Sequence, residues 1–146
     1  MRVLLDVNIL VRAHEGSHGP ARALLLTLIE QGHTLLISDP MLIELAAVLR
    51  YPRIQVVYGL TEEQVYAYIQ SLREVCEVVT VDDLLPAPIR DPKDVAVLQT
   101  AVIGEADVIC TRDSDFYAAA TRTFCATLGI EVCTDLELVT RIKRSP

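Results

Sequence analysis

Short apolar runs alternate with helix-like segments along the whole chain, and this alternation restricts the fold more than any other feature. The expected strands are Arg2–Leu5, Thr34–Ile37, Val78–Val81, Asp107–Thr111 and Ile130–Cys133. The expected helices are His18–Gln31, Asp39–Tyr51, Thr61–Glu77, Asp91–Ile103 and Asp135–Lys143. Strands that alternate with helices form parallel sheets covered on both faces. We therefore predict a single domain over residues 1–146, with a three-layer α/β/α fold and a mainly parallel, five-stranded sheet.

Local signals mark where several of these helices begin. Asp39-Pro40 and Asp91-Pro92 each combine a capping carboxylate with a proline suited to the first turn. Thr61 and Gln64 have the spacing of a capping box, in which the Gln64 side chain reaches back to the cap. A proline-rich connection, residues 84–90, separates the third strand from the helix after it.

Composition excludes several classes of protein. None of the four cysteines belongs to a C-x-x-C pair, so we expect buried thiols and no zinc site. No apolar run approaches the roughly 18 residues that a membrane span needs, and an acid at position 6 argues against a signal peptide. We expect a cytoplasmic protein. The net charge of −7 predicts weak non-specific affinity for nucleic acid, even if bound cations neutralise several carboxylates.

Four acids follow strand ends or lie near helix starts: Asp6, Glu44, Asp94 and Asp113. In a parallel sheet these positions share one edge, where ligands bind, so the four side chains should converge. Carboxylates are the ligands that Mg²⁺ and Mn²⁺ prefer. Two such ions about 4 Å apart can activate water for hydrolysis of a phosphodiester. The pattern therefore predicts a site for a divalent cation at this edge, of a kind that can support such hydrolysis.

These segments resemble the motifs of the PIN-domain family. Val3–Leu10 resembles the first motif, Ser38–Leu49 the second, Arg90–Asp94 the third and Ala106–Asp113 the fourth. Each motif alone is weak, but the four occur in the expected order and span roughly Met1 to Cys133. The Arg-Asp-Pro form of the third motif is similar to that of VapC-like proteins, the toxins of type II toxin–antitoxin pairs.

The resemblance implies a hydrolase that cuts RNA, an endoribonuclease dependent on Mg²⁺ or Mn²⁺. Its acidic set would be Asp6, Glu44, Asp94 and Asp113, with Asp115 as a further metal ligand. Asn8, Thr111 and Asp91 would support those acids. Lys93-Asp94-Val95 departs from the Asp-Asp-Asp run common after this proline, which leaves the number of metal ions open. The resemblance also implies a small antitoxin that covers the acidic cleft, and a possible homodimer.

Contacts with RNA are harder to assign from the sequence. Arg12, Arg50 and Arg112 lie in segments near the acidic edge and are candidates for phosphate contacts, and so are His14, His18 and Arg53. Few aromatic residues are present to stack on bases. The alternative function is a non-catalytic PIN-fold scaffold or interaction module. A phospho-receiver or a haloacid-dehalogenase-type phosphatase fits less well, because Asp6-Val7-Asn8 supplies one acid where those proteins need two.

Overall fold

Five parallel strands form the centre of the computed structural model, which describes residues 1–81, 85 and 87–144. The strands are β1 (Arg2–Leu5), β2 (Thr34–Ser38), β3 (Glu77–Val79), β4 (Val108–Cys110) and β5 (Glu131–Cys133). Their order across the sheet is β3-β2-β1-β4-β5, and every neighbouring pair is parallel. The predicted five-stranded parallel sheet is confirmed. The central strand β1 buries Val3, Leu4 and Leu5, as a strand covered on both faces must.

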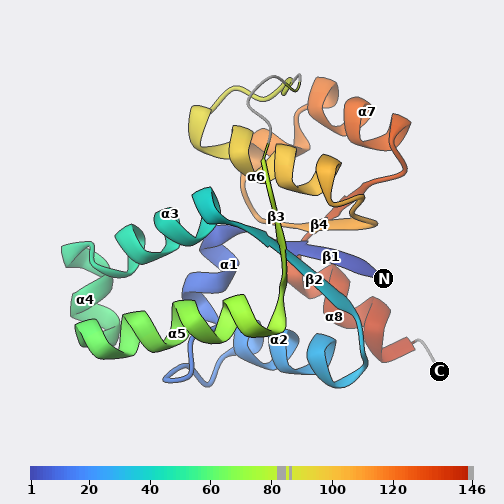
Figure 1. Cartoon of the computed structure of the whole chain (residues 1–146). Coiled ribbons are helices and arrows are strands. Elements are labelled where there is room, and N and C mark those ends of the chain that lie inside the picture. The colour runs from blue at the N-terminus through green and yellow to red at the C-terminus, as the bar shows by residue number, and fades with distance from the viewer. Residues whose placement is uncertain (82–84, 86, 145–146) are drawn as a thin grey trace.

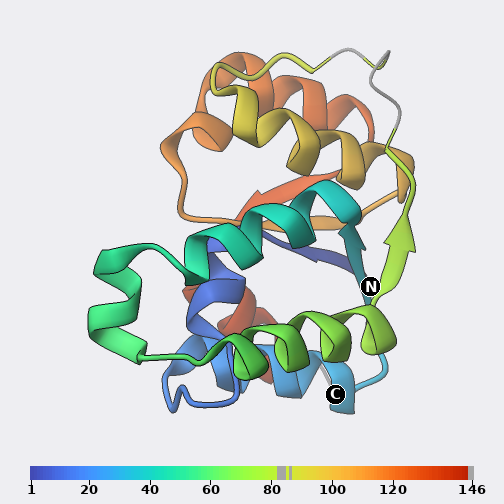
Figure 2. The same ribbon diagram turned by 60° about the vertical axis from the view of Figure 1, so that its left-hand side comes forward.

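Helices cover both faces of this sheet (Figures 1 and 2). One face carries α6 (Pro92–Ile103) and α7 (Ala119–Thr127). The other face carries α2 (Pro20–Glu30), α5 (Glu62–Val75) and α8 (Asp135–Arg144). The three remaining helices, α1 (Val7–Arg12), α3 (Asp39–Leu49) and α4 (Pro52–Tyr58), lie beyond the carboxyl ends of the strands. The predicted three-layer α/β/α architecture is therefore confirmed.

Several helices were not expected from the sequence. The run Val7–Arg12 forms α1 directly after β1, but it is only six residues long, too short to show a helical period in the sequence. Asp6 starts this helix by accepting a hydrogen bond from the Val7 backbone, which turns the chain at that point. Pro52 ends the preceding helix as expected, but it also occupies the first turn of α4. A 3₁₀ helix, η1 (Ser114–Tyr117), and α7 were also not anticipated.

The helix-start predictions had mixed outcomes. Thr61 and Gln64 form the expected capping box, and Asp91 caps α6 by accepting from the Lys93 backbone at 3.0 Å. The prediction that Asp39 caps α3 was wrong, because Ser38 occupies the cap position and Asp39 is the first helical residue. The Asp39 carboxylate instead forms an ion pair with Arg73 of α5, at 2.6 Å. Residues 82–84 and 86, in or beside the predicted proline-rich connection, lie outside the described residues.

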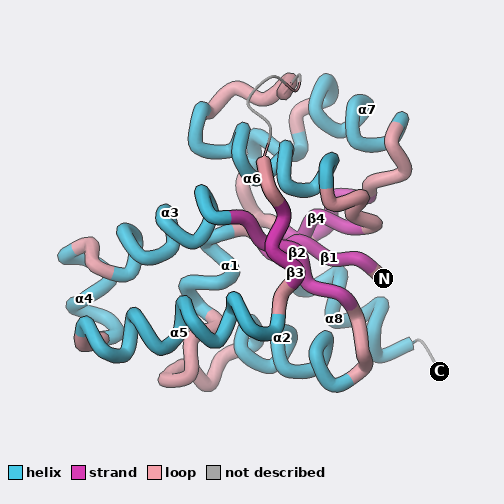
Figure 3. The backbone as a smooth tube through the Cα atoms, in the orientation of Figure 1, coloured by secondary structure: helices cyan, strands magenta, loops and turns pink. Residues whose placement is uncertain are grey.

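The sheet order determines where a ligand could bind. From the central strand β1 the chain proceeds outward through β2 and β3, and then returns to the other side of β1 as β4 and β5. The topological switch therefore lies between β1 and β4. In open parallel sheets a crevice forms there, beyond the carboxyl ends of the strands. Figure 3 shows the chain leaving the strands for helices and loops at this edge.

Candidate metal centre

Asp6 lies at the carboxyl end of β1, at this switch point. Its side chain is 4% exposed and accepts two hydrogen bonds, one from the Val7 backbone at 2.6 Å and one from the Thr111 hydroxyl at 2.7 Å. Burial raises the pKa of Asp6, the two hydrogen bonds lower it in part, and the charge of Asp113 raises it further. The carboxylate is thus held in one orientation in surroundings that disfavour its negative charge.

Thr111 and Asp113 follow β4 and approach Asp6 from the neighbouring strand. The Thr111 hydroxyl, which donates to Asp6, also accepts from the Asp113 backbone at 3.0 Å. Asp113 in turn caps η1 by accepting from the Asp115 backbone at 2.9 Å. The Tyr117 hydroxyl donates to the Thr111 carbonyl at 2.7 Å. This chain of hydrogen bonds holds the ends of β1 and β4 in register with the start of η1.

Asp94 enters the same crevice from the first turn of α6. It is 7% exposed, and its Oδ2 atom has no hydrogen-bond partner among the described residues. The pKa of Asp94 is raised to about 8 by burial, by a hydrogen bond with the Asp113 side chain, and by the charges of Asp113, Asp6 and Asp91. Carboxyl groups this close cannot all be ionised unless a cation lies between them.

A cleft of about 180 Å³ opens above these acids. Its polar lining is Asp6, Asn8, Glu44, Asp91, Asp94 and Asp113, with Tyr51, Arg53 and Lys93 beside them. Glu44, from the first half of α3, is one-third exposed, and the Lys93 ammonium lies 3.9 Å from its carboxylate. The cleft therefore has an acidic floor and two cationic side chains in its wall.

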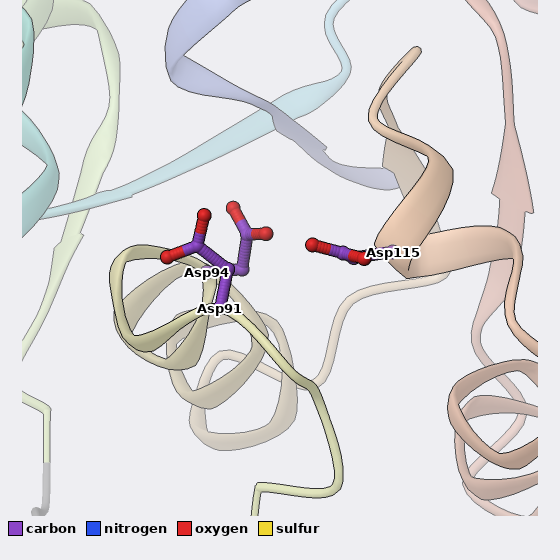
Figure 4. A group of neighbouring side chains, drawn as sticks. All are labelled: Asp91, Asp94 and Asp115. Atoms are coloured by element: carbon purple, nitrogen blue, oxygen red, sulfur yellow. The ribbon is translucent and has the colours of Figure 1, made fainter.

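Asp115 extends the acidic floor on the η1 side. Figure 4 shows Asp91 and Asp94, from the start of α6, and Asp115, from η1, around a common space. One carboxylate oxygen of each lies within 4.8 Å of the others. The Arg90 guanidinium pairs with Asp115, with nitrogen–oxygen distances of 3.1 and 3.2 Å. Asp94 thus belongs to two groups of acids, one with Asp6 and Asp113 and one with Asp91 and Asp115.

The donor set fits a hard divalent cation. All of the charged donors on the cleft floor are carboxylate oxygens, which Mg²⁺ and Mn²⁺ prefer. The unpartnered Oδ2 of Asp94 supplies a free ligand atom, and a buried polar atom left unsatisfied costs on the order of 1–3 kcal/mol. A bound cation would satisfy that atom and offset the like charges. Asp91, Asp94 and Asp115 have carboxylate oxygens close enough together to share one ion. Asp6, Asp113 and Glu44 line the same cleft and offer further oxygen ligands for that ion, its water or a second ion.

The structure brings most of the predicted site residues together. Asp6, Asn8, Glu44, Asp91, Asp94 and Asp113 line one cleft, Thr111 lies behind Asp6, and Asp115 lies beside Asp91. Of the arginines considered for phosphate contacts, Arg53 lines this cleft, whereas Arg12, Arg50 and Arg112 are not among the described residues that line it. Arg50 forms an ion pair with Glu62, and both Arg12 and Arg112 pair with Asp135.

Two cationic residues lie in the cleft wall, Arg53, which the sequence analysis names as a candidate for a phosphate contact, and Lys93, which it does not. Arg53 lies on α4, a helix that was not predicted because Pro52 was interpreted only as the end of the preceding helix. Lys93 was noted only as a departure from an acidic run. Its position beside Asp94 in a helix start with a proline could have placed it at the cleft, because the side chains of a first helical turn surround the ligand side of that helix.

Comparisons with known proteins agree with this geometry. The family described as PIN domain matches residues 2–115. The fold is similar to that of a chain in the crystal structure of VapBC2 from Rickettsia felis bound to a DNA fragment from their promoter. The two share 16% sequence identity over 92% of this chain and 98% of that chain, with a TM-score of 0.60. No match is found among curated proteins. None of the helices in the described part of the chain has the length and apolar character of a membrane span.

Proposed function

This chain belongs to the PIN-domain family, and we propose that it is an endoribonuclease that hydrolyses RNA phosphodiester bonds with Mg²⁺ or Mn²⁺. The observation that carries the proposal is the buried Asp94 carboxyl, with an unpartnered oxygen and with Asp6 and Asp113 as neighbours. A carboxyl in such surroundings is destabilising in a purely structural role. It is useful where a metal ion must be bound.

The residues of the cleft would have different roles in such a reaction. Asp6, Asp94 and Asp113 would hold the cation, with Glu44 and Asp115 completing one or two ion sites. When bound, a divalent cation lowers the pKa of water and offsets charge on the phosphate. The Thr111 hydroxyl and the Val7 backbone keep Asp6 in its ligating orientation. Arg53 and Lys93, in the cleft wall, would contact phosphate oxygens of the substrate.

We further propose that the protein is the toxin of a toxin–antitoxin pair, acting as a single PIN unit in the cytoplasm. The fold similarity to a VapBC2 chain and the VapC-like form of the third motif support this role. A small antitoxin would then cover the acidic cleft and contribute a basic side chain to it. A homodimer is compatible with this arrangement and is tested by measuring the molar mass in solution.

The first experiment measures cleavage of labelled single-stranded and tRNA-like RNAs, with Mn²⁺ or Mg²⁺ compared with EDTA. Wild type should cut only with metal, and Asp6→Asn should not cut. Asp39→Asn is the matched control, since Asp39 pairs with Arg73 outside the described cleft lining. Equal cutting by wild type and Asp6→Asn would contradict the proposal. Metal binding by calorimetry without any cutting would instead favour the non-catalytic PIN scaffold.

A further inference from the structure

A second buried carboxylate, Asp135, lies at the same edge of the sheet, at the start of α8. It is 1% exposed and pairs with two arginines. Arg112 binds it in a bidentate manner, with distances of 2.6 and 3.1 Å, and Arg12 approaches it at 3.5 Å. We call Arg12 and Arg112 the arginine pair, and Asp135 is the carboxylate that both of them contact. Their formal charges sum to a net positive charge, in a chain whose total is −7.

The arginine pair lies close to the acidic cleft. Arg112 directly precedes Asp113 in the chain, so their Cα atoms are about 3.8 Å apart. At the end of β4 the Cys110 carbonyl accepts a hydrogen bond from the Asp6 backbone at 3.0 Å. The next residue, Thr111, donates from its backbone to the Cys133 carbonyl at 2.9 Å, two residues before Asp135. The cleft and the arginine pair therefore flank the end of β4.

We propose that Arg12 and Arg112 bind phosphate groups that neighbour the cleaved phosphate on the same RNA strand. This inference rests on the proposed function and assigns it a substrate-binding surface. A guanidinium has five N–H donors, and Asp135 occupies two nitrogens of Arg112, which leaves the remaining donors of both arginines for a second anion. Their side chains are 34% and 52% exposed, so a ligand can reach them.

The role of Asp135 is to position these two side chains. A free arginine loses much rotamer entropy when it binds an anion, and a buried carboxylate that already holds it reduces that loss. Asp135 carries one negative charge against two positive charges, so the pair keeps an attraction for phosphate. Arg50, by contrast, is matched one-to-one by Glu62. A chain with a net negative charge can therefore still bind RNA through a local cationic surface at the edge of the sheet that carries the cleft.

The test measures Mn²⁺-dependent RNA cleavage at a series of salt concentrations between about 50 and 200 mM for Arg12→Gln, Arg112→Gln and the control Arg2→Gln. Arg2 pairs with Glu77 at the amino-terminal edge of the sheet, so its replacement removes the same charge far from the cleft. Arg12→Gln and Arg112→Gln should each raise KM several-fold and leave kcat unchanged. Each should also reduce the slope of log KM against log salt by about 0.7, the value for one lost phosphate contact on a single strand. Arg2→Gln should change neither quantity.

Arg112→Gln leaves Asp135 less well paired and can impair folding, whereas Arg12→Gln keeps the bidentate pair intact and is therefore the decisive variant. Identical KM values and salt slopes for Arg12→Gln, Arg2→Gln and wild type would overturn the inference. Calorimetric titration with Mn²⁺ separates the two hypotheses, because the arginine variants should bind the ion as wild type does. If wild type binds Mn²⁺ without cutting, anisotropy of a labelled RNA gives the same slopes, and absence of RNA binding overturns the inference. Absence of Mn²⁺ binding by wild type would contradict the proposed function instead.

Discussion

Asp94 and Asp135 are two buried aspartates at the same edge of one sheet, and their surroundings are opposite. Asp94 has carboxylates as neighbours, an unpartnered oxygen, and a pKa raised to about 8 by burial, the hydrogen bond with Asp113 and nearby negative charge. Asp135 has two arginines as neighbours. Burial raises the pKa of Asp135, but the hydrogen bond and charge of Arg112, with the charge of Arg12, outweigh it and lower the pKa overall.

The difference separates a carboxylate that is paired with cations of its own chain from one that has only carboxylates around it and that we propose as a metal ligand. At Asp135 the chain supplies its own cations, so the charge is compensated in the folded protein without any bound ion. At Asp94 the fold gathers like charges, and either a proton or a bound cation must compensate them. Burial alone therefore does not identify a functional acid. The sign of the neighbouring charges does.

The largest expected effect comes from removing the charge of Asp94. Asp94→Asn should lower RNA cleavage by at least about 100-fold, because even outer-shell changes at metal sites cost 10–100-fold. The metal-free variant should be at least as stable as wild type at pH 8, since the repulsion with Asp6 and Asp113 is removed. Cleavage rates and thermal unfolding in EDTA measure the two effects. A variant that loses both activity and stability would make Asp94 a structural residue like Asp135.

The converse change at Asp135 should mainly affect stability. Asp135→Ala should lower the free energy of unfolding by about 2 kcal/mol, less than the 3–5 kcal/mol typical when a buried pair is broken, because the two arginines are partly solvated. Denaturation by urea, read as a shift in midpoint at constant slope, measures this loss. Asp39→Ala, which breaks the exposed pair with Arg73, is the control. An equal shift in both variants would remove the distinction between buried and exposed pairs.

The pH dependence of stability should have opposite signs at the two sites. A folded pKa of about 8 for Asp94, above its ordinary value of 3.8, means that the unfolded chain is ionised where the folded one is protonated. In EDTA the melting temperature should therefore fall as the pH rises toward 8, and Mn²⁺ should reverse the fall. The lowered pKa of Asp135 contributes stability that is lost only as the pH falls through the acid range.

Measurements between pH 6.5 and 8.5 isolate the contribution of Asp94. Burial and the charge of Arg22 lower the pKa of His14, so its effect on stability lies below about pH 6.5, the ordinary pKa of histidine. Asp94→Asn should flatten the profile in this window. An unchanged profile in that variant would mean that other groups, such as Asp6, carry the pH dependence.

Much of the fold and of the acid set was predictable because the signals are local. Apolar strands that end at Asp6 and before Asp113, and a proline after the Asp91 cap, place side chains at one edge without any knowledge of tertiary contacts. The short helix α1 was not predictable, since six residues show no clear helical period. Asp39 was misassigned because Ser38 and Asp39 are both good caps, and the sequence does not show that the Asp39 carboxylate pairs with the distant Arg73.

The pairing of Asp135 could not be predicted from local signals either, because its partners are distant in the sequence. In the sequence it is an ordinary acid at a helix start, a position that the helix dipole favours. Its partners Arg112 and Arg12 are brought to it by the sheet order, across separations that no periodic pattern reports. Sequence reasoning could thus find acids that share an edge, but it could not determine which of them would meet a cation of the same chain.

The smallest expected effect is that of Glu62→Gln, which tests whether the burial of an ion pair or its bidentate geometry stabilises the fold. Glu62 binds Arg50 in a bidentate manner, with distances of 2.9 and 2.8 Å, much as Asp135 binds Arg112. Glu62, however, is 74% exposed, and its partner is 47% exposed. Surface pairs contribute little because water and salt already solvate both charges. Glu62→Gln should therefore produce no measurable change in melting temperature at physiological salt.

Glu63→Gln is the matched control for this last variant, because Glu63 also lies in the first turn of α5 and feels the same helix dipole. Equal melting temperatures for Glu62→Gln, Glu63→Gln and wild type would mean that bidentate geometry alone stabilises nothing measurable. A loss at Glu62 as large as that at Asp135 would instead assign the stability to the geometry of the pair. Burial would then no longer explain the larger loss of stability that we expect at Asp135.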